Sequence, residues 1–370
     1  MSDAHARYLS TRHFGSLDGL RCLSILPVIW HHATPRPLPG IWGKGPAGVD
    51  LFFCISGYLI TTLLLREKAR TGRIALGAFY VRRALRIWPL YYALLAAYAL
   101  FAWLAPHDAA QSTHFFRTLP LYATFTANWF ANWAVPFPIL FSFAWSLCVE
   151  EQFYAFWPWL VRALSARSAF AAMCVLIAGD ALAEQGVFSA WLGPSALRVA
   201  TSFAAPIGLG SLLALALDQR PGFGFLAALL SKRWSAPLAL AAVAGLLCWP
   251  SAPLFAFQAA LAALLGACVM REDNALAPLL RARPVAYVGA LSYGAYLLNS
   301  TGIGLIRRLF PGQVEHAGVV FWLSLPLVLA LAALSHRYLE APFLGLRARF
   351  RHAEVTAPES AARSASAPAP

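Results

Sequence analysis

Two imidazoles and one guanidinium lie in a single apolar stretch of the chain, LDGLRCLSILPVIWHHA at residues 17–33. Arg21 lies near its start, and His31 and His32 lie at its end. If the stretch is one α-helix, Arg21 and His32 are separated by about 16 Å, roughly half the hydrocarbon core of a bilayer. An ionisable side chain there costs about 2.5–3.5 kcal/mol on insertion scales and indicates a functional site. The alternative is that both groups lie at helix ends, where arginine snorkels and histidine meets headgroup water.

Three carboxylates are expected at a similar depth, near the outer face. Asp50 lies at the start of an apolar segment, and Glu150 and Glu151 lie just inside a later one. A carboxylate that accepts a hydrogen bond from one imidazole nitrogen fixes the tautomer, so that the other nitrogen can act as a base. We therefore expect Glu150 or Asp50 to orient and charge His32, and we assign these three residues as catalytic.

A second polar group is the arginine run in FYVRRALRIWP. Arg83 and Arg86 are three residues apart, on one helix face, where two guanidinium forks can hold phosphates; Arg82 lies beside them. The alternative is ordinary anchoring on the cytoplasmic side. The arginines can hold an anion near the cytoplasmic face, and the histidine can act as a base near the outer face. The sequence therefore predicts an enzyme that takes a phosphate-bearing donor from the cytoplasm. Its acceptor comes from the far side, and we expect clamp and base to share one continuous cavity.

The elements that must position these groups are membrane helices. The chain has 370 residues, 59% hydrophobic and only 12% charged, with a mean hydropathy of +0.61, so we expect an all-α polytopic membrane protein. The net charge of +13 is explained by basic residues in alternate loops, which place both termini in the cytoplasm and require no nucleic-acid partner. The ten predicted spans cover residues 17–33, 47–65, 86–104, 144–161, 168–183, 199–217, 235–250, 252–270, 287–306 and 318–336.

Residues outside the spans divide the rest of the chain. Residues 1–16 are expected to form a cytoplasmic segment, 17–345 the membrane domain and 346–370 a basic, then disordered tail. The long stretch 105–143 is interpreted as a re-entrant or interfacial element on the outer side. There, Trp129, Trp133 and Phe137 suit the headgroup zone, and Asn128 and Asn132 can meet a polar ligand. An eleventh span is the alternative, but it would invert every later loop.

Several stretches resemble the acyltransferase-3 family, the O-antigen acetylase-like membrane acyltransferases, over nearly the whole chain. They are SLDGLRCLSILPVIWHHA, GVDLFFCISGYLITTLLL, FYVRRALRIWPLYY, FAWSLCVEEQFYAFWPWL, LSYGAYLLNS and SHRYLEAPF. Arg21 and His32 match the family's spacing of an arginine and a histidine. Asn299 departs from the family, because many members have histidine there.

The resemblance implies transfer of an acyl group, most simply acetyl from acetyl-CoA, to a hydroxyl of a carbohydrate or glycolipid of the cell envelope, in the bacterial inner membrane. It implies that His32 is the essential histidine, with His31 as the alternative base. The acyl-CoA is expected to contact Arg83, Arg86, Arg82 and Arg21. The acceptor is expected to contact Trp145, Tyr154, Asn299, Ser56 and Glu151.

Two other classes of function compete with this one. Ten spans with buried arginine, histidine and carboxylates also describe a proton-coupled transporter or flippase, although no inverted repeat is visible. A receptor or scaffold gains nothing from costly intramembrane charges. The spacing of His, Cys and carboxylate residues does not match a metal-binding motif, so no metal is expected. The sequence does not indicate an oligomeric state. The chain also lacks the hydrolase-like domain that some family members carry, which predicts a single-module enzyme.

Overall fold

The structure is a computed structural model that describes residues 2–11, 13–34, 40–104, 109–135, 139 and 141–347. Within these ranges it is all-helical, which confirms the predicted class. The first half contains α1 (Ser2–Ser10), α2 (Ser16–Ala33), α3 (Ala47–Thr71), α4 (Leu76–Leu104), α5 (Ala109–Ala123), α6 (Ala127–Phe130), α7 (Ala144–Ala163) and α8 (Ala166–Glu184).

The second half has more short helices. It contains α9 (Pro194–Ala200), α10 (Ala205–Asp218), α11 (Arg220–Leu230), α12 (Ser235–Cys248), α13 (Leu254–Met270), α14 (Ala277–Leu280), α15 (Arg283–Ala290), α16 (Ser292–Leu309), α17 (Ala317–Ser335) and α18 (Ala341–Leu346). Two 3-10 turns, η1 (Gly40–Gly43) and η2 (Pro311–Gln313), and a π-helical turn, η3 (His336–Glu340), complete the described elements.

Helix α3 is central, because α2, α7, α10 and α13 all pack against it. Its contact with α10 depends on glycine. A Cβ on Gly57 would lie 1.9 Å from the Ile207 carbonyl oxygen, and one on Gly210 would lie 2.0 Å from that of Cys54. The two backbones therefore touch, as they do in small-residue contacts between membrane helices. Helix α3 ends at Gly72, whose φ of 72° lies in the left-handed region that glycine adopts without strain.

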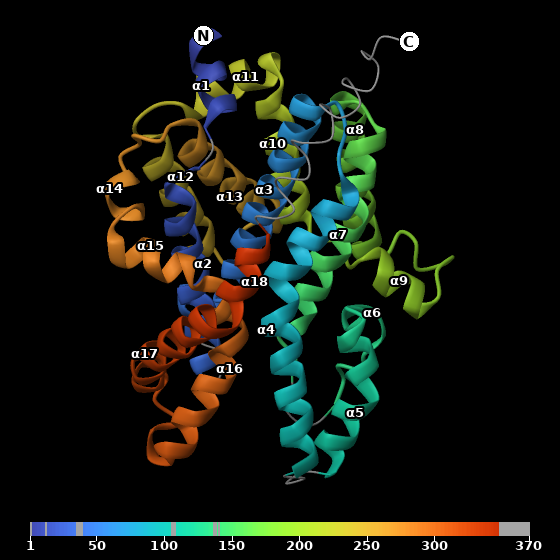
Figure 1. The fold of residues 1–370 in the computed structure, drawn as a ribbon, viewed down its shortest axis with the longest axis vertical. Coiled ribbons are helices and arrows are strands. Elements are labelled where there is room, and N and C mark those ends of the chain that lie inside the picture. The colour runs from blue at the N-terminus through green and yellow to red at the C-terminus, as the bar shows by residue number, and fades with distance from the viewer. Residues whose placement is uncertain are drawn as a thin grey trace, which may run out of the picture.

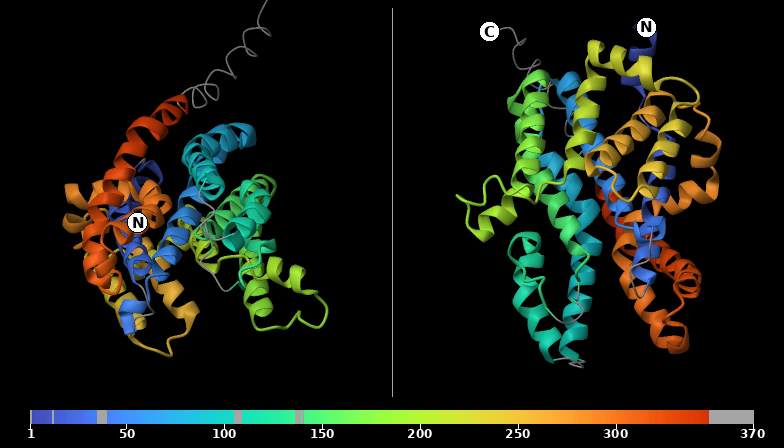
Figure 2. Two further views of the ribbon diagram at one scale, coloured as in Figure 1. Left: turned by 90° about the horizontal axis from the view of Figure 1, so that it is seen from below. Right: turned by 180° about the vertical axis from the view of Figure 1, so that it is seen from behind.

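Helices α3, α4, α5, α7 and α8 run roughly parallel to the long axis of the molecule (Figure 1). Helices α1 and α11 lie at one end, and the far part of α4 and helix α5 lie side by side at the opposite end (Figures 1 and 2). The segment that contains α9 projects from the side of the bundle. Helix α2 runs from the α1 end toward the α5 end, so His32 lies closer to the α5 end than Arg21 does.

All ten segments predicted as spans are largely helical, but their bounds differ from the prediction. Five helical stretches in the described ranges are long and apolar enough to cross a membrane: Ala47–Thr71, Leu76–Leu104, Ala166–Glu184, Pro194–Asp218 and Ala317–Leu346. The count of ten spans and the cytoplasmic placement of both termini stay predictions.

Two differences change where polar groups lie. Helix α4 begins at Leu76, ten residues before the predicted span, so Arg82 and Arg83 also lie inside this helix. The described part of 105–143 contains α5 and α6, and α5 packs along α4, while the re-entrant or interfacial placement of this stretch stays a prediction. Phe137 and the tail beyond residue 347 lie outside the described residues.

Candidate active site

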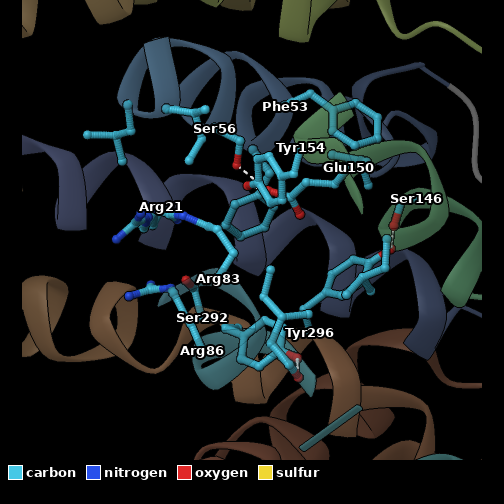
Figure 3. Close-up of a pocket in the computed structure, with 17 residues that line it drawn as sticks. Arg21, Phe53, Ser56, Arg83, Arg86, Ser146, Glu150, Tyr154, Ser292 and Tyr296 are labelled. Atoms are coloured by element: carbon cyan, nitrogen blue, oxygen red, sulfur yellow. Dashed lines mark hydrogen bonds between the residues drawn. The ribbon is translucent and has the colours of Figure 1, made fainter. Parts of the chain in front are cut away.

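A cavity of about 100 Å³ lies where α2, α3, α4, α7 and α16 meet (Figure 3). We call it the arginine chamber, because Arg21, Arg83 and Arg86 line it. In Figure 3 their guanidinium groups lie together on one side, and Ser146 and Tyr296 lie on the other. The remaining lining residues are Val49, Phe52, Phe53, Ser56, Leu59, Ile60, Ile87, Leu147, Glu150, Tyr154, Ser292 and Tyr293.

The arginine chamber carries more positive than negative charge. Arg83 and Arg86 are one turn apart on α4, as their spacing predicts, and Arg21 reaches the chamber from α2. Glu150 is the one carboxylate in the lining, and within the described part of the chain no salt bridge joins it to any of the three arginines. Three guanidinium groups and one carboxylate leave a site suited to an anion.

Arg83 is held by aromatic rings. Its guanidinium carbon lies 5.8 Å from the ring centroid of Phe79 and 5.7 Å from that of Tyr154, which are cation–π distances. Its Nε is buried and has no hydrogen-bond partner among the described residues. An unsatisfied buried donor is costly, so the arrangement favours a ligand that brings an acceptor.

Glu150 is occupied by two hydroxyl groups rather than by an imidazole. Ser56 donates a hydrogen bond of 2.5 Å to Glu150 Oε1, and the Tyr154 hydroxyl donates to the same oxygen. The prediction placed Glu150 at the outer face with the histidines and apart from the arginines; that separation is wrong. Glu150 from α7 lines the same cavity as Arg83 and Arg86 from α4 and Arg21 from α2.

His32 lies on α2 outside the lining of the arginine chamber. Its Nδ1 donates a hydrogen bond of 3.0 Å to the Val28 carbonyl, and its own carbonyl accepts from Arg307 at 3.2 Å. A carbonyl only accepts, so Nδ1 carries the proton and Nε2 is left as a base. The tautomer is thus fixed by the helix backbone, and the expectation that Glu150 or Asp50 orients His32 is wrong. The two histidine rings are 5.5 Å apart, and neither histidine lines the arginine chamber, so the single cavity expected to join His32 to the arginines stays a prediction.

Arg82 is turned away from the arginine chamber. It pairs with the buried Glu67 at 3.0 Å and is not part of the lining. Consecutive residues of a helix point about 100° apart, so Arg82 and Arg83 cannot share one face. The expected contact of Arg82 with the acyl donor therefore has no support in this geometry.

Glu151 and Asn299 lie in neither cavity described here. Glu151 Oε2 accepts a hydrogen bond of 3.2 Å from Trp88 Nε1, while its buried Oε1 has no partner among the described residues. Asn299 is fully buried, and its side-chain nitrogen donates to the Tyr296 carbonyl one turn earlier. The predicted contact of these two residues with the acceptor stays a prediction.

A second cavity, of about 540 Å³, borders the first, and Phe53 lines both. We call it the carboxylate chamber, because Asp50, Asp180 and Glu184 line it. Trp145, predicted to contact the acceptor, also lies here, and its ring packs edge-to-face against Phe53 with centroids 6.2 Å apart. The other lining residues are Asn128, Val149, Ile177, Ala181, Gln185, Arg198, Thr201, Ser202, Phe203, Ala204, Ala205, Pro206, Leu254, Phe255 and Gln258.

Comparison with known proteins assigns the family. The sequence model of an acyltransferase domain, Acyl_transf_3, matches residues 14–336. The chain belongs to the acyltransferase-3 family. The predicted family and the predicted acyltransferase class of enzyme are confirmed, and the arginine chamber lies wholly inside the matched region.

Two curated relatives of this acyltransferase-3 chain cover most of its length. It is 29% identical to the Bacillus subtilis protein named "Putative peptidoglycan O-acetyltransferase YrhL", over 90% of this chain and 55% of the relative. It is 26% identical to the peptidoglycan O-acetyltransferase OatA of Listeria monocytogenes, over 90% of this chain and 56% of the relative. The chain therefore spans about half the length of these relatives. No solved structure matches it.

Sequence reasoning missed several residues of both chambers. Ser292, Tyr293 and Tyr296 lie in the motif LSYGAYLLNS, from which only Asn299 was given a role. Asp180 was overlooked although it is a carboxylate inside an apolar predicted span, the signal that singled out other residues. In the described part of the chain, no three His, Cys, Asp or Glu side chains are grouped as metal ligands.

Proposed function

We propose that this acyltransferase-3 chain is a membrane O-acyltransferase that moves acetyl from acetyl-CoA to a hydroxyl of a cell-envelope carbohydrate. The supporting observation is the arginine chamber, which contains Arg21, Arg83 and Arg86 and a single carboxylate. That carboxylate, Glu150, accepts hydrogen bonds from two hydroxyl groups of the lining rather than from an arginine. Guanidinium groups bind phosphates through paired, charge-assisted hydrogen bonds. The names of the relatives make a peptidoglycan glycan the first acceptor to test.

The donor binds with its phosphates on the three arginines. The chamber of about 100 Å³ is smaller than the typical ligand site of about 300–1,000 Å³, so CoA has to widen it. The pantetheine arm, which separates the phosphates of CoA from its thioester, then runs beside α2. Arg21 and His32 are separated by about 16 Å of helix, and the extended arm covers this distance.

His32 is the general base. Its Nδ1 proton is committed to the Val28 carbonyl, which leaves Nε2 to accept the proton of the attacking hydroxyl. The hydroxyl oxygen forms a bond to the thioester carbonyl carbon, and the bond to sulfur breaks. The CoA thiolate leaves and takes up a proton, while the ester stays on the acceptor. A positioned base of this kind contributes about 10²–10⁴ in rate.

The membrane setting completes the proposal. The enzyme is a multi-pass protein of the bacterial inner membrane, with residues 17–345 as its acyltransferase domain between segment 1–16 and tail 346–370. Both termini and the entrance for acyl-CoA face the cytoplasm, and the acceptor meets the enzyme on the outer side. The ten predicted spans fit this arrangement, because an even number of spans places both termini on one side of the membrane.

The test is a transfer assay with purified protein in detergent. Labelled acetyl-CoA and soluble peptidoglycan fragments are expected to give an O-acetylated glycan, seen by mass spectrometry as a gain of one acetyl group per modified sugar. A protein that binds no CoA and transfers no acetyl group, although folded, would contradict the proposal and favour a transporter.

A further inference from the structure

The carboxylate chamber contains a buried carboxylate, that of Asp180, with one oxygen that no described residue bonds. Asp180 is 5% exposed, and its Oδ1 has no hydrogen-bond partner among the described residues. Glu184 lies one turn later on the same face of α8 and lines the same cavity. Like charges at this spacing destabilise a helix, and a buried carboxylate oxygen without a donor is costly. Both costs fall when a ligand brings donors to the pair.

The chamber offers little positive charge of its own. Asp50 adds a third carboxylate, and Arg198 is the one cation in the lining. In the described ranges no salt bridge joins Arg198 to any of the three carboxylates. The site therefore repels an anionic molecule such as an acyl-CoA, and it selects for a ligand that donates hydrogen bonds without carrying negative charge.

Neutral polar groups and aromatic rings complete the lining. The amides of Asn128 and Gln258 can donate and accept, and Gln258 is 7% exposed. The aromatic residues Trp145 and Phe255 also line the cavity. The carboxylates can accept hydrogen bonds from sugar hydroxyls, and the amides can both donate and accept them. The aromatic rings can pack against the C–H faces of a sugar. Together these groups suit a polyhydroxylated chain.

The cavity is also large enough and correctly placed. Its volume of about 540 Å³ lies within the usual range of about 300–1,000 Å³ for ligand sites. It meets the arginine chamber at Phe53, which lines both. A ligand in the carboxylate chamber is thus one side chain away from the chamber assigned to the donor.

We propose that the carboxylate chamber binds the glycan chain of the acceptor, with Asp180 and Glu184 accepting hydrogen bonds from sugar hydroxyls. This inference rests on the proposed O-acyltransferase function. The two chambers then sort the substrates by charge, since the phosphates of the donor go to the arginines and the neutral hydroxyls of the acceptor go to the carboxylates.

The experiment measures both ligands on the full chain in detergent. Binding of CoA and of a neutral N-acetylglucosamine oligosaccharide, which represents the glycan chain, is titrated calorimetrically for wild type, Asp180→Asn and Glu184→Gln. Asp273→Asn is the matched control, because Asp273 is exposed, pairs with Arg271 at 3.1 Å and lies outside both chambers. Each chamber variant is expected to bind the oligosaccharide at least tenfold more weakly while its CoA affinity stays within twofold. The control is expected to match wild type for both ligands.

The outcomes separate the two proposals. If wild type binds CoA but binds no glycan, or if Asp180→Asn and Glu184→Gln bind glycan as wild type does, the acceptor assignment of this chamber is overturned and the enzyme's function is not. If wild type binds no CoA, the proposed function itself fails. If a variant loses both ligands, its melting temperature is compared with that of wild type. The conservative Asp180→Glu is then expected to bind CoA normally and the glycan weakly. If Asp180→Glu binds neither ligand although its melting temperature is normal, the inference is overturned.

Discussion

The arginine chamber and the carboxylate chamber share the ring of Phe53 but differ in charge and size. The first, of about 100 Å³, has three guanidinium groups and one carboxylate. The second, of about 540 Å³, has three carboxylates and one guanidinium. Neighbouring sites of opposite charge can hold an anionic donor and a neutral acceptor at once without exchanging them. We therefore expect charge, rather than shape alone, to separate the two substrates.

The largest effect is expected from the residue that both substrates need. His32→Ala removes Nε2, and the transfer rate should fall by about 10²–10⁴ because no base takes the hydroxyl proton. CoA and glycan affinities should change little. The rate is measured with saturating substrates, and His31→Ala serves as the control for the neighbouring ring. If folded His32→Ala transfers the acyl group at nearly the wild-type rate, the reaction does not need this imidazole as a base.

The next effect concerns the arginine chamber alone. Arg83→Gln removes a charged donor to phosphate, which is typically worth about 1.5–3 kcal/mol, so KM for acetyl-CoA should rise roughly 10- to 100-fold. The glycan KM should stay unchanged. Arg70→Gln is the matched control, because Arg70 is exposed at the end of α3 and outside the chamber. If both variants change KM for acetyl-CoA equally, Arg83 does not bind the donor and only adds to the positive charge expected on the cytoplasmic side.

A smaller effect is expected at the hydroxyl that holds Glu150. Tyr154→Phe removes the hydrogen bond to Glu150 and weakens the ring contact with Arg83, for a loss of about 1–2 kcal/mol in kcat/KM for acetyl-CoA, or roughly 5- to 30-fold. Ser56→Ala removes the other donor to the same oxygen and should act in the same direction. A rise of kcat/KM for acetyl-CoA in Tyr154→Phe would contradict the prediction, because it would mean that the hydrogen bond from Tyr154 to Glu150 does not help the donor to bind.

The smallest effect tests the boundary. Phe53 is 4% exposed, and Phe53→Leu opens the contact between the chambers without removing a charge. Hydrolysis of acetyl-CoA by water should rise a few-fold relative to transfer, because water from the larger chamber enters the arginine chamber and follows the bound donor. The ratio of free acetate to acetylated glycan measures this. An unchanged ratio in a folded variant would mean that Phe53 does not separate the two substrates.

The sequence predicted the parts of the fold that depend on local pattern. The apolar runs are helical, and the three-residue spacing brings Arg83 and Arg86 onto one face. Depth was harder to predict, because it depends on how far each helix extends past its neighbours. Glu150 was therefore assigned to the wrong group of side chains.

Side-chain partners were the least predictable part of the site. The tautomer of His32 is set by the Val28 carbonyl of its own helix, a contact that depends on a rotamer rather than on spacing. Asp180 and Trp145 come together through the packing of α7, α8 and α10, which residue patterns within one helix do not encode. Long-range packing decided which polar groups meet, and the sequence alone predicted only that they exist.

The most direct test of the account is a structure of the protein with CoA bound. The account predicts the CoA phosphates within hydrogen-bonding distance of Arg21, Arg83 and Arg86, a widened arginine chamber and a pantetheine arm that ends beside His32 Nε2. Phosphates bound outside the chamber, or a sulfur that ends far from His32, would contradict it.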